Sequence, residues 1–142
     1  MSDKPPARVV LPRFPEPISQ PFWDATRDHR LTYQTCDRCH TVVFYPRTHC
    51  TRCTSTDLSW NESKGIGTIY TFSVIRRSQH PSFMAKVPYV IAWVDLDERF
   101  RIMSHIVDVD PDDPKGGLEI GARVEVHWQD HDTVSLPAFR LS

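Results

Sequence analysis

The second half of the chain consists of short runs of β-branched and aromatic residues separated by polar turns, a pattern typical of an all-β domain. Five such runs predict strands over residues 66–75, 89–96, 100–107, 122–128 and 136–141. Along 122–128 apolar and polar residues alternate strictly, which places Val124 and His127 on opposite faces. Run 89–96 is apolar on both faces and predicts a strand covered on both sides. Five strands with a long connection between the third and fourth favour a closed OB-type barrel, although a small sandwich has the same strand count.

The first thirty residues have a different pattern. Residues 1–20 hold five prolines among apolar residues such as Leu11 and Phe14 and predict an extended arm, which packs on a partner or on its own domain; a disordered tail fits as well. Residues 21–30 predict a short helix that begins at Pro21, and its Phe22 and Trp23 would anchor it on the ribbon described below or on a partner. The expected organisation is mainly β: arm and helix over 1–30, a cysteine module over 31–61 and an OB-fold over 62–142.

Composition narrows the class of protein. The 142 residues are 39% hydrophobic and 25% charged, as in folded globular domains. A net charge of −1 provides no general attraction for nucleic acid. No apolar run approaches the roughly 20 residues of a membrane span, and the N-terminus lacks the apolar core of a signal peptide. We therefore expect a soluble, cytoplasmic protein without membrane contact.

All four cysteines lie in two identical pairs, Cys36-x-x-Cys39 and Cys50-x-x-Cys53, separated by ten residues. Each pair predicts a tight knuckle that aims two sulfur atoms at one point, and two knuckles complete a tetrahedral thiolate site that suits structural zinc. Residues 41–49, between the pairs, predict a short hairpin. Two disulfides, a redox pair or an iron site are the alternatives, but nothing indicates secretion.

Histidines flank the cysteines but add nothing that the metal site needs. His40 and His49 each adjoin a cysteine. Because four sulfurs already fill a tetrahedral site, we expect both to be surface residues. A site closed in this way has no open position for catalysis, so its expected role is to stabilise a module too small to fold alone.

The segment 76–88, between the first two predicted barrel strands, combines basic and apolar residues in a loop that OB folds often use for binding. The basic side chains could meet phosphate groups such as those of CoA, and the apolar ones could insert into a partner. A solvated loop whose phenylalanine packs back on the barrel is the alternative. The candidate contact residues are Arg76, Arg77, His80, Phe83, Met84 and Lys86, together with Phe22 and Trp23.

No catalytic residue is predicted. The cysteines are assigned to the metal, and the seven histidines lie in no recognisable catalytic motif. Asp110, Asp112 and Asp113 are separated by a proline and fit a solvated turn better than a pair of catalytic carboxylates. This favours a non-catalytic subunit.

Several short motifs, in their order and spacing, resemble the domain of unknown function 35 (DUF35) family, whose members join a rubredoxin-like zinc ribbon to an acyl-CoA-associated OB fold. The resemblance extends from about Phe22 to the end of the chain. Its motifs are Cys36-x-x-Cys39, Pro46-Arg47, Cys50-x-x-Cys53, Trp60, Gly65-x-Gly67-Thr68-Ile69-Tyr70, Pro88-Tyr89-Val90, Val94-Asp95-Leu96, Gly121 and Leu136-Pro137-x-Phe139. Two positions depart from it, because glycine commonly follows the second cysteine, where this chain has His40, and also the acidic turn, where it has Glu98-Arg99-Phe100.

The resemblance implies an accessory subunit of a thiolase-like acyl-CoA enzyme, either a steroid side-chain aldolase or an acyltransferase. The partner would carry the catalytic groups and would form a heteromer with this chain, namely a heterotetramer. A CoA thioester would bind to this complex. Two other functions stay open: a nucleic-acid-binding module, because ribbons and OB folds bind nucleic acid elsewhere, and a free-standing acyl-CoA binder.

Overall fold

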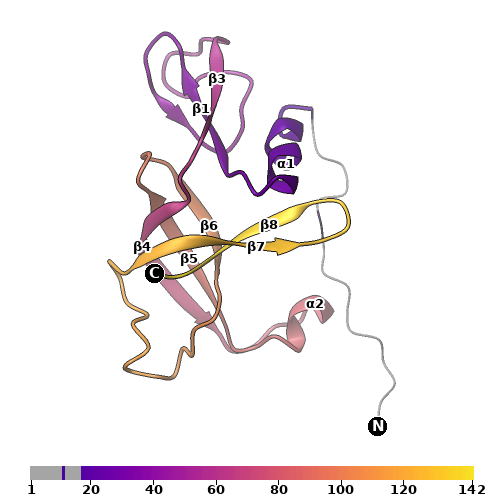
Figure 1. Ribbon diagram of the computed structural model, residues 1–142, viewed down its shortest axis with the longest axis vertical. Coiled ribbons are helices and arrows are strands. Elements are labelled where there is room, and N and C mark those ends of the chain that lie inside the picture. The colour runs from indigo at the N-terminus through magenta and orange to yellow at the C-terminus, as the bar shows by residue number, and fades with distance from the viewer. Residues whose placement is uncertain (1–10, 12–16) are drawn as a thin grey trace.

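Two β-sheets organise the chain, a three-stranded sheet in the order β2-β1-β3 and a closed barrel in the order β4-β5-β6-β8-β7. The computed structural model describes Leu11 and residues 17–142. The elements are α1 (Gln20–Arg27), β1 (Thr32–Cys36), β2 (Val42–Val43), β3 (Leu58–Glu62), β4 (Ile66–Ile75), α2 (Pro81–Met84), β5 (Tyr89–Leu96), β6 (Arg101–Ile106), β7 (Arg123–Asp130) and β8 (Ser135–Leu141). Figure 1 shows the small sheet at one end with α1 beside it, the barrel below, and α2 on the far side. None of the described helices is long and apolar enough to cross a membrane.

The predicted N-terminal helix is present but shorter than expected. It contains Pro21 in its first turn and ends at Arg27 instead of residue 30. It ends early because the amide of Asp28 turns back to the carbonyl of Ala25 at 3.0 Å, and His29 follows with a left-handed φ of 57°. Residues 1–10 and 12–16 of the predicted arm lie outside the described residues, so the arm stays a prediction.

The prediction of a hairpin over residues 41–49 is wrong, because the small sheet is built differently. Val42 and Val43 pair with Thr35 and Gln34 of β1, across the first cysteine knuckle. The knuckle itself reverses the chain, since the amide of Cys36 donates to the carbonyl of Thr41 at 2.9 Å. Strand β3, which the sequence pattern did not reveal, then pairs with β1 along its whole length.

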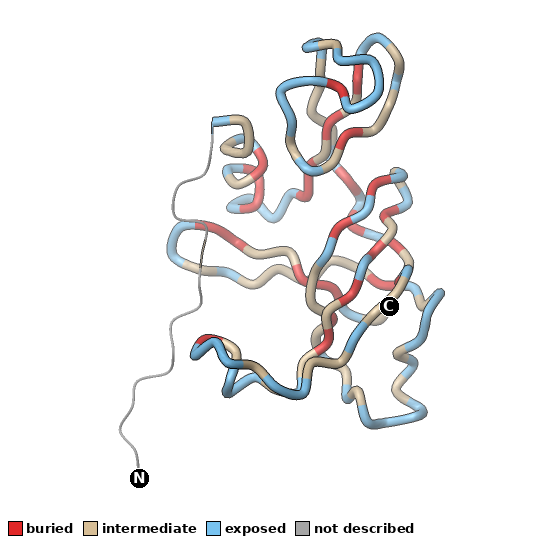
Figure 2. The backbone as a smooth tube through the Cα atoms, turned by 180° about the vertical axis from the view of Figure 1, so that it is seen from behind, coloured by how far each residue is buried: buried red, intermediate tan, exposed pale blue. Residues whose placement is uncertain are grey.

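The five predicted barrel strands are all present, and those over 66–75 and 89–96 have the predicted bounds. Neighbouring strands are antiparallel except β6 and β8, which run parallel and close the barrel through the single pair Ile106↔Phe139. The interior is apolar, and the red segments of the barrel in Figure 2 mark its buried residues. Its largest fully buried side chains are Ile69, Val90, Val94, Val124 and Phe139. Because the five strands close into one barrel through a single parallel strand pair, the domain is an OB-fold and not a sandwich.

Strand β5 is not covered on both sides, contrary to the expectation from its apolar residues. Trp93, on its outer face, is 37% exposed. Trp93 pairs with Met103 of β6, and Met103 and Tyr70 of β4 are more than half exposed. The apolar outer positions therefore form an open patch on the barrel instead of a second buried face.

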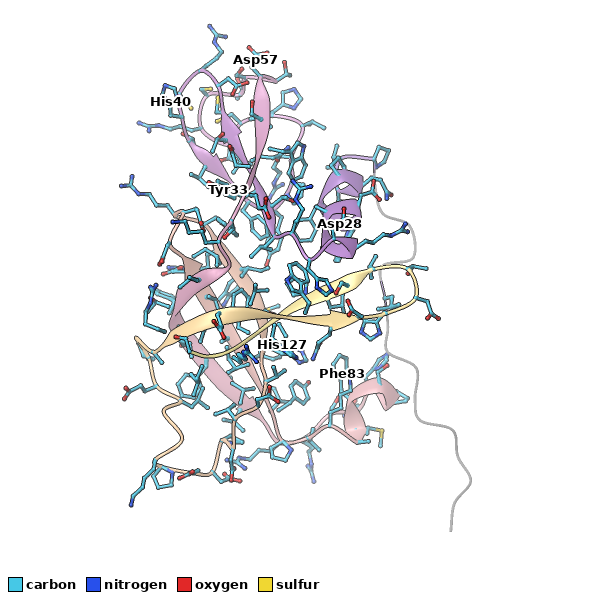
Figure 3. The ribbon with its side chains drawn as sticks, in the orientation of Figure 1. Asp28, Tyr33, His40, Asp57, Phe83 and His127 are labelled. Atoms are coloured by element: carbon cyan, nitrogen blue, oxygen red, sulfur yellow. The ribbon has the colours of Figure 1, made fainter. Side chains whose placement is uncertain are left out.

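Aromatic rings join the small sheet to the barrel in one core. Phe100, just before β6, lies 4.9 Å from the ring of Tyr33 in β1 and 4.8 Å from that of Phe44 after β2. Phe22 of α1 packs against Phe44 at 6.0 Å. Figure 3 shows Tyr33 at the base of the small sheet, above the barrel. This shared packing holds helix, small sheet and barrel in one arrangement.

Candidate functional site

The four cysteine sulfurs come together at the end of the small sheet, and all of them lie within 4.8 Å of one another. Sγ of Cys36 is 3.5 Å from Sγ of Cys53, and Sγ of Cys39 is 3.5 Å from Sγ of Cys50. Sulfurs bound to one tetrahedral zinc at about 2.3 Å lie roughly 3.8 Å apart. The donor set and its spacing therefore fit zinc, and four sulfurs close the site.

The two knuckles share one backbone design. In each, the amide of the second cysteine points at the first sulfur, at 3.5 Å in both pairs. The residue after the second cysteine then turns back to the first cysteine's carbonyl, from His40 to Cys36 at 2.9 Å and from Thr54 to Cys50 at 3.1 Å. Both residues have left-handed φ angles, 62° for His40 and 64° for Thr54.

This backbone explains the glycine that commonly follows the second cysteine. Glycine adopts a left-handed conformation without steric cost, and other residues adopt it at a cost of about 1–2 kcal/mol. Arg99, at the other position where glycine is common, likewise has a φ of 74°. Both departures from the family pattern therefore leave the local fold intact while placing strain in it.

The groups around the sulfurs act in both directions on the thiolate form that a metal requires: the backbone of Ser55 lowers the pKa of Cys53, but the neighbouring Cys36 thiol and burial outweigh it and raise that pKa to about 11. The hydroxyl and backbone of Thr41 lower the pKa of Cys39 to about 6. Neither histidine beside the knuckles belongs to the metal-capable cluster among the described residues, which consists of the four cysteines. The Nδ1 atom of His49 instead contacts the Thr48 hydroxyl at 2.8 Å.

A groove of about 850 Å³ lies between α1, the base of the ribbon, strands β6 and β8, and the segment after α2. Apolar and aromatic side chains from each part line it, among them Trp23, Tyr45, Phe83, Tyr89, Met103 and Leu136. Its charged lining consists of Lys86 and Asp108 among the described residues. This size and character are typical of sites that bind a small molecule or a short peptide.

The groove brings together two groups of residues that were candidates from sequence. Trp23 from α1 and Phe83 and Lys86 from the 76–88 loop all line it. Phe22 also borders the groove, but its side chain is only 6% exposed because it packs within the core. Figure 3 shows Phe83 on α2, beside the lower part of the barrel.

The other candidates of the 76–88 loop lie elsewhere. Arg76 forms an ion pair with Asp112 at 2.7 Å. The imidazole of His80 accepts a hydrogen bond from the amide of Ser82 and so caps α2. Arg77 and Met84 are exposed and lie outside the groove lining.

Sequence reasoning missed His105, which lies in the groove wall. Its ring stacks on Tyr89 at 5.2 Å and lies 5.9 Å from that of Phe83. Burial, with a smaller contribution from Lys86, lowers its pKa. The feature that could have identified His105 from sequence is its outward position on a predicted strand, near a loop that is itself a binding candidate.

One cluster contains the residue types of a catalytic triad but not their order. The Oδ1 atom of Asp130 accepts from the Ser135 hydroxyl at 2.7 Å and contacts Nε2 of His29 at 2.6 Å. The carboxylate lies between serine and histidine, so the imidazole is not placed to take the serine proton. Ser135 is moreover buried, and the cluster ties the end of α1 to the β7–β8 hairpin. Its arrangement is structural.

Comparisons with known proteins agree with this architecture. Residues 23–59 match the family described as ChsH2, rubredoxin-like zinc ribbon domain, and residues 60–129 match ChsH2, C-terminal OB-fold domain. The solved structure of the Ltp2-ChsH2(DUF35) aldolase superimposes with a TM-score of 0.78 at 32% identity, over 89% of this chain and 95% of that chain.

Two curated relatives extend the comparison. A DUF35 domain-containing scaffold protein of Methanothermobacter thermautotrophicus is 37% identical over 99 residues, 69% of this chain and 71% of that protein. A protein of Thermomonospora curvata named "Probable enoyl-CoA hydratase alpha subunit" is 36% identical over 121 residues, 84% of this chain. This chain spans only 36% of the length of that hydratase subunit.

Proposed function

The chain belongs to the DUF35 family of ChsH2-type proteins, in which a rubredoxin-like zinc ribbon precedes an OB-fold domain, and on this basis we propose that it is a non-catalytic subunit of a thiolase-like acyl-CoA enzyme. The partner carries the catalytic groups and forms a heteromer, a heterotetramer, with this chain. The reaction is carbon–carbon bond cleavage in a steroid side-chain CoA thioester, or acyl transfer of the thiolase type.

The observation that carries this proposal is the groove, which three parts of the chain build together and whose described lining residues form no catalytic arrangement. The zinc ribbon contributes Tyr45 and Pro46, α1 contributes Trp23, and the barrel contributes β6 and β8. A surface assembled in this way depends on a fixed ribbon, which gives the metal a scaffolding role. The name of the Ltp2-ChsH2(DUF35) aldolase supports the same kind of assembly for a relative.

A CoA thioester bound to the complex would meet this chain through the remaining basic residues of the 76–88 loop. Arg76 is occupied by Asp112, whereas Arg77 is exposed and Lys86 faces the groove. We place the complex in the cytoplasm, where thiols stay reduced and four cysteines are available to the metal.

Co-expression with a thiolase-like subunit from the same genome tests the proposal. We expect the two chains to co-purify and elute together on gel filtration, and we expect acyl-CoA turnover to require both. Full turnover by this chain alone, or failure to bind any thiolase-like subunit of that genome, would contradict the proposal.

The alternative functions receive less support. Arginines 76, 101, 123 and 140 each form an ion pair with a carboxylate, so they do not build the free basic groove of a single-strand binder. A free-standing acyl-CoA binder would bind acyl-CoA with the same affinity with and without the partner, and calorimetric titration distinguishes it from a subunit.

A further inference from the structure

The segment just before α1 has the proline spacing of a polyproline II ligand. It reads Pro12-Arg13-Phe14-Pro15-Glu16-Pro17, in which Pro12 and Pro15 enclose two residues, as in the P-x-x-P motif. A polyproline II helix has three residues per turn, so residues 12 and 15 would share one edge of it. Because proline fixes φ near about −65°, such a segment loses little conformational freedom when it docks.

This segment leads directly to the groove. At its start, Leu11 is partly buried although it lies nine residues before α1, so it contacts other residues of the chain. At its end, Ile18 and Ser19 line the groove. A polyproline II helix from residue 12 to residue 18 covers roughly 19 Å, at about 3.1 Å per residue. The segment is therefore tethered at the groove itself.

The groove has the wall that a polyproline II ligand needs. Such ligands dock on aromatic rings, and Trp23, Tyr45, Phe83 and Tyr89 all line the groove. A polyproline II backbone makes no internal hydrogen bonds, so its carbonyls need donors from the surface that binds it. The oxygen of Tyr45 accepts from the amide of Met103 at 3.2 Å, which leaves the phenol hydrogen to donate elsewhere. The indole N–H of Trp23 is a second ring donor.

The charges of the groove and of the segment are complementary. Lys86 and Asp108 are the charged residues of the described lining, and both are exposed. Neither forms an ion pair with another described residue. The segment also carries one charge of each sign, on Arg13 and Glu16. The two surfaces can therefore pair at both charges, which a purely apolar occupant cannot do.

We propose that residues 12–16 dock into the groove of their own chain as a polyproline II helix and cover it in the free subunit, with the two prolines on the aromatic rings and Glu16 beside Lys86. The inference goes beyond the proposed function, because it concerns the chain alone and its tests need no partner. A short tether gives an effective concentration of about 1 mM, so an intrinsic affinity of about 100 µM keeps the segment docked about ten times as often as free.

Trypsin cleavage of the wild-type chain tests the docking. The Arg13–Phe14 bond lies inside the docked segment, whereas the Arg8–Val9 bond lies ahead of it. Both rates are measured by mass spectrometry relative to those in a synthetic peptide of residues 1–18. We expect the Arg13–Phe14 bond to be cut about tenfold more slowly than the Arg8–Val9 bond. Equal relative rates overturn the proposal, and so does protection that fades on dilution, because it assigns the segment to a neighbouring chain.

An exchange of charges tests the place of the segment in the groove. Glu16→Lys and Lys86→Glu each put like charges together, and we expect each to reduce the protection of the bond after Arg13 about threefold. The double variant has opposite charges again and should restore the protection. Arg77→Glu changes an exposed residue of the same loop outside the groove lining and is the control, which should keep the wild-type protection. A double variant as readily cleaved as the single variants overturns the proposal.

A peptide of residues 8–18 added to a chain that lacks residues 1–16 separates docking from the tether. The described helices and strands all begin after residue 19, so we expect the shortened chain to fold, and its zinc content and thermal unfolding check this. We expect the peptide to bind the shortened chain with a Kd of about 100 µM and the full chain about tenfold more weakly, because the chain's own segment competes. The control peptide carries Pro12→Ala and Pro15→Ala and should bind at least about tenfold more weakly. Equal binding to the two chains, or no binding to the folded shortened chain, overturns the proposal.

Discussion

The phenol oxygen of Tyr45, at the base of the zinc ribbon, accepts a hydrogen bond from the backbone amide of Met103 at 3.2 Å, on a barrel strand 58 residues further along the chain. This bond ties the ribbon to strand β6 of the barrel, and both residues line the groove. The position of the ribbon and the shape of the groove are therefore linked.

Replacing Tyr45 with phenylalanine should destabilise the protein slightly. The amide of Met103 loses its partner, and because Tyr45 is 44% exposed, water restores part of the bond. We expect a loss of about 0.5–1 kcal/mol in the free energy of unfolding, measured with urea. Tyr70→Phe is the control, since Tyr70 is also exposed, its hydroxyl interacts with the Arg101 side chain and not with a backbone amide, and its ring still packs against Arg101 after the change. Equal losses in the two variants would argue against the Tyr45 bond.

Phe100→Ala should be among the most damaging single changes. Phe100 is 5% exposed and packs between Tyr33 and Phe44, where the ribbon meets the barrel. We expect a loss of about 3–5 kcal/mol, read from thermal or urea unfolding. Phe83→Ala, at a half-buried position beside the groove, should cost clearly less. A mild effect at Phe100 would mean that the two parts hold together without this ring.

Cys36→Ser should remove the metal and unfold the ribbon. Cys36 is buried and provides one of four sulfurs, and a module of this size depends on its metal for folding. We expect zinc content, measured by atomic absorption, to fall to near zero, and partner binding to be lost as a consequence. A variant or a chelated protein that keeps both fold and complex without metal would contradict the scaffolding role.

His40→Gly should stabilise the ribbon. The left-handed backbone at His40 costs about 1–2 kcal/mol for a side chain, and the greater freedom of glycine in the unfolded chain offsets part of the gain. We expect a net increase of about 0.5–1 kcal/mol in the free energy of unfolding of the zinc-loaded protein. His49 is not one of the described residues with a left-handed φ, so His49→Gly should be destabilising. A loss of stability at position 40 would show that the strain is absent.

His105 should make the protein less stable in mild acid. Burial lowers its folded-state pKa, so the unfolded chain takes up the proton first and stability falls as pH decreases below about 6.5. The charged group facing His105 is Lys86, which disfavours the second positive charge. In His105→Phe, which keeps a ring on Tyr89, the loss between about pH 7 and pH 5 should shrink. Urea titrations at pH 7 and pH 5 measure this loss of stability, and His49→Phe is the control. If His105→Phe loses as much stability between the two pH values as the wild type does, the assignment to His105 is contradicted.

The elements that sequence predicted well are those in which local pattern and final environment agree. Strands β4 and β5 have the predicted bounds because their β-branched runs end at polar turns. Strand β3 escaped prediction because Ser59 and Asn61, on either side of its central Trp60, are polar, and it forms by pairing with β1. Apolar residues alone do not distinguish a buried face from an exposed patch, so the sequence pattern predicts a covered outer face on β5 where the structure has the exposed Trp93.

The sequence alone was enough to predict the four cysteines as candidate metal ligands, the five barrel strands and the family, because cysteine spacing and strand periodicity are local properties of the chain. Where these parts meet emerged from the tertiary structure: Trp23, Tyr45, Phe83 and His105 border one groove, and β8 closes the barrel against β6 beside it. Those relations join residues far apart in the chain. They depend on how the barrel closes and how the ribbon packs against it, which no local pattern encodes.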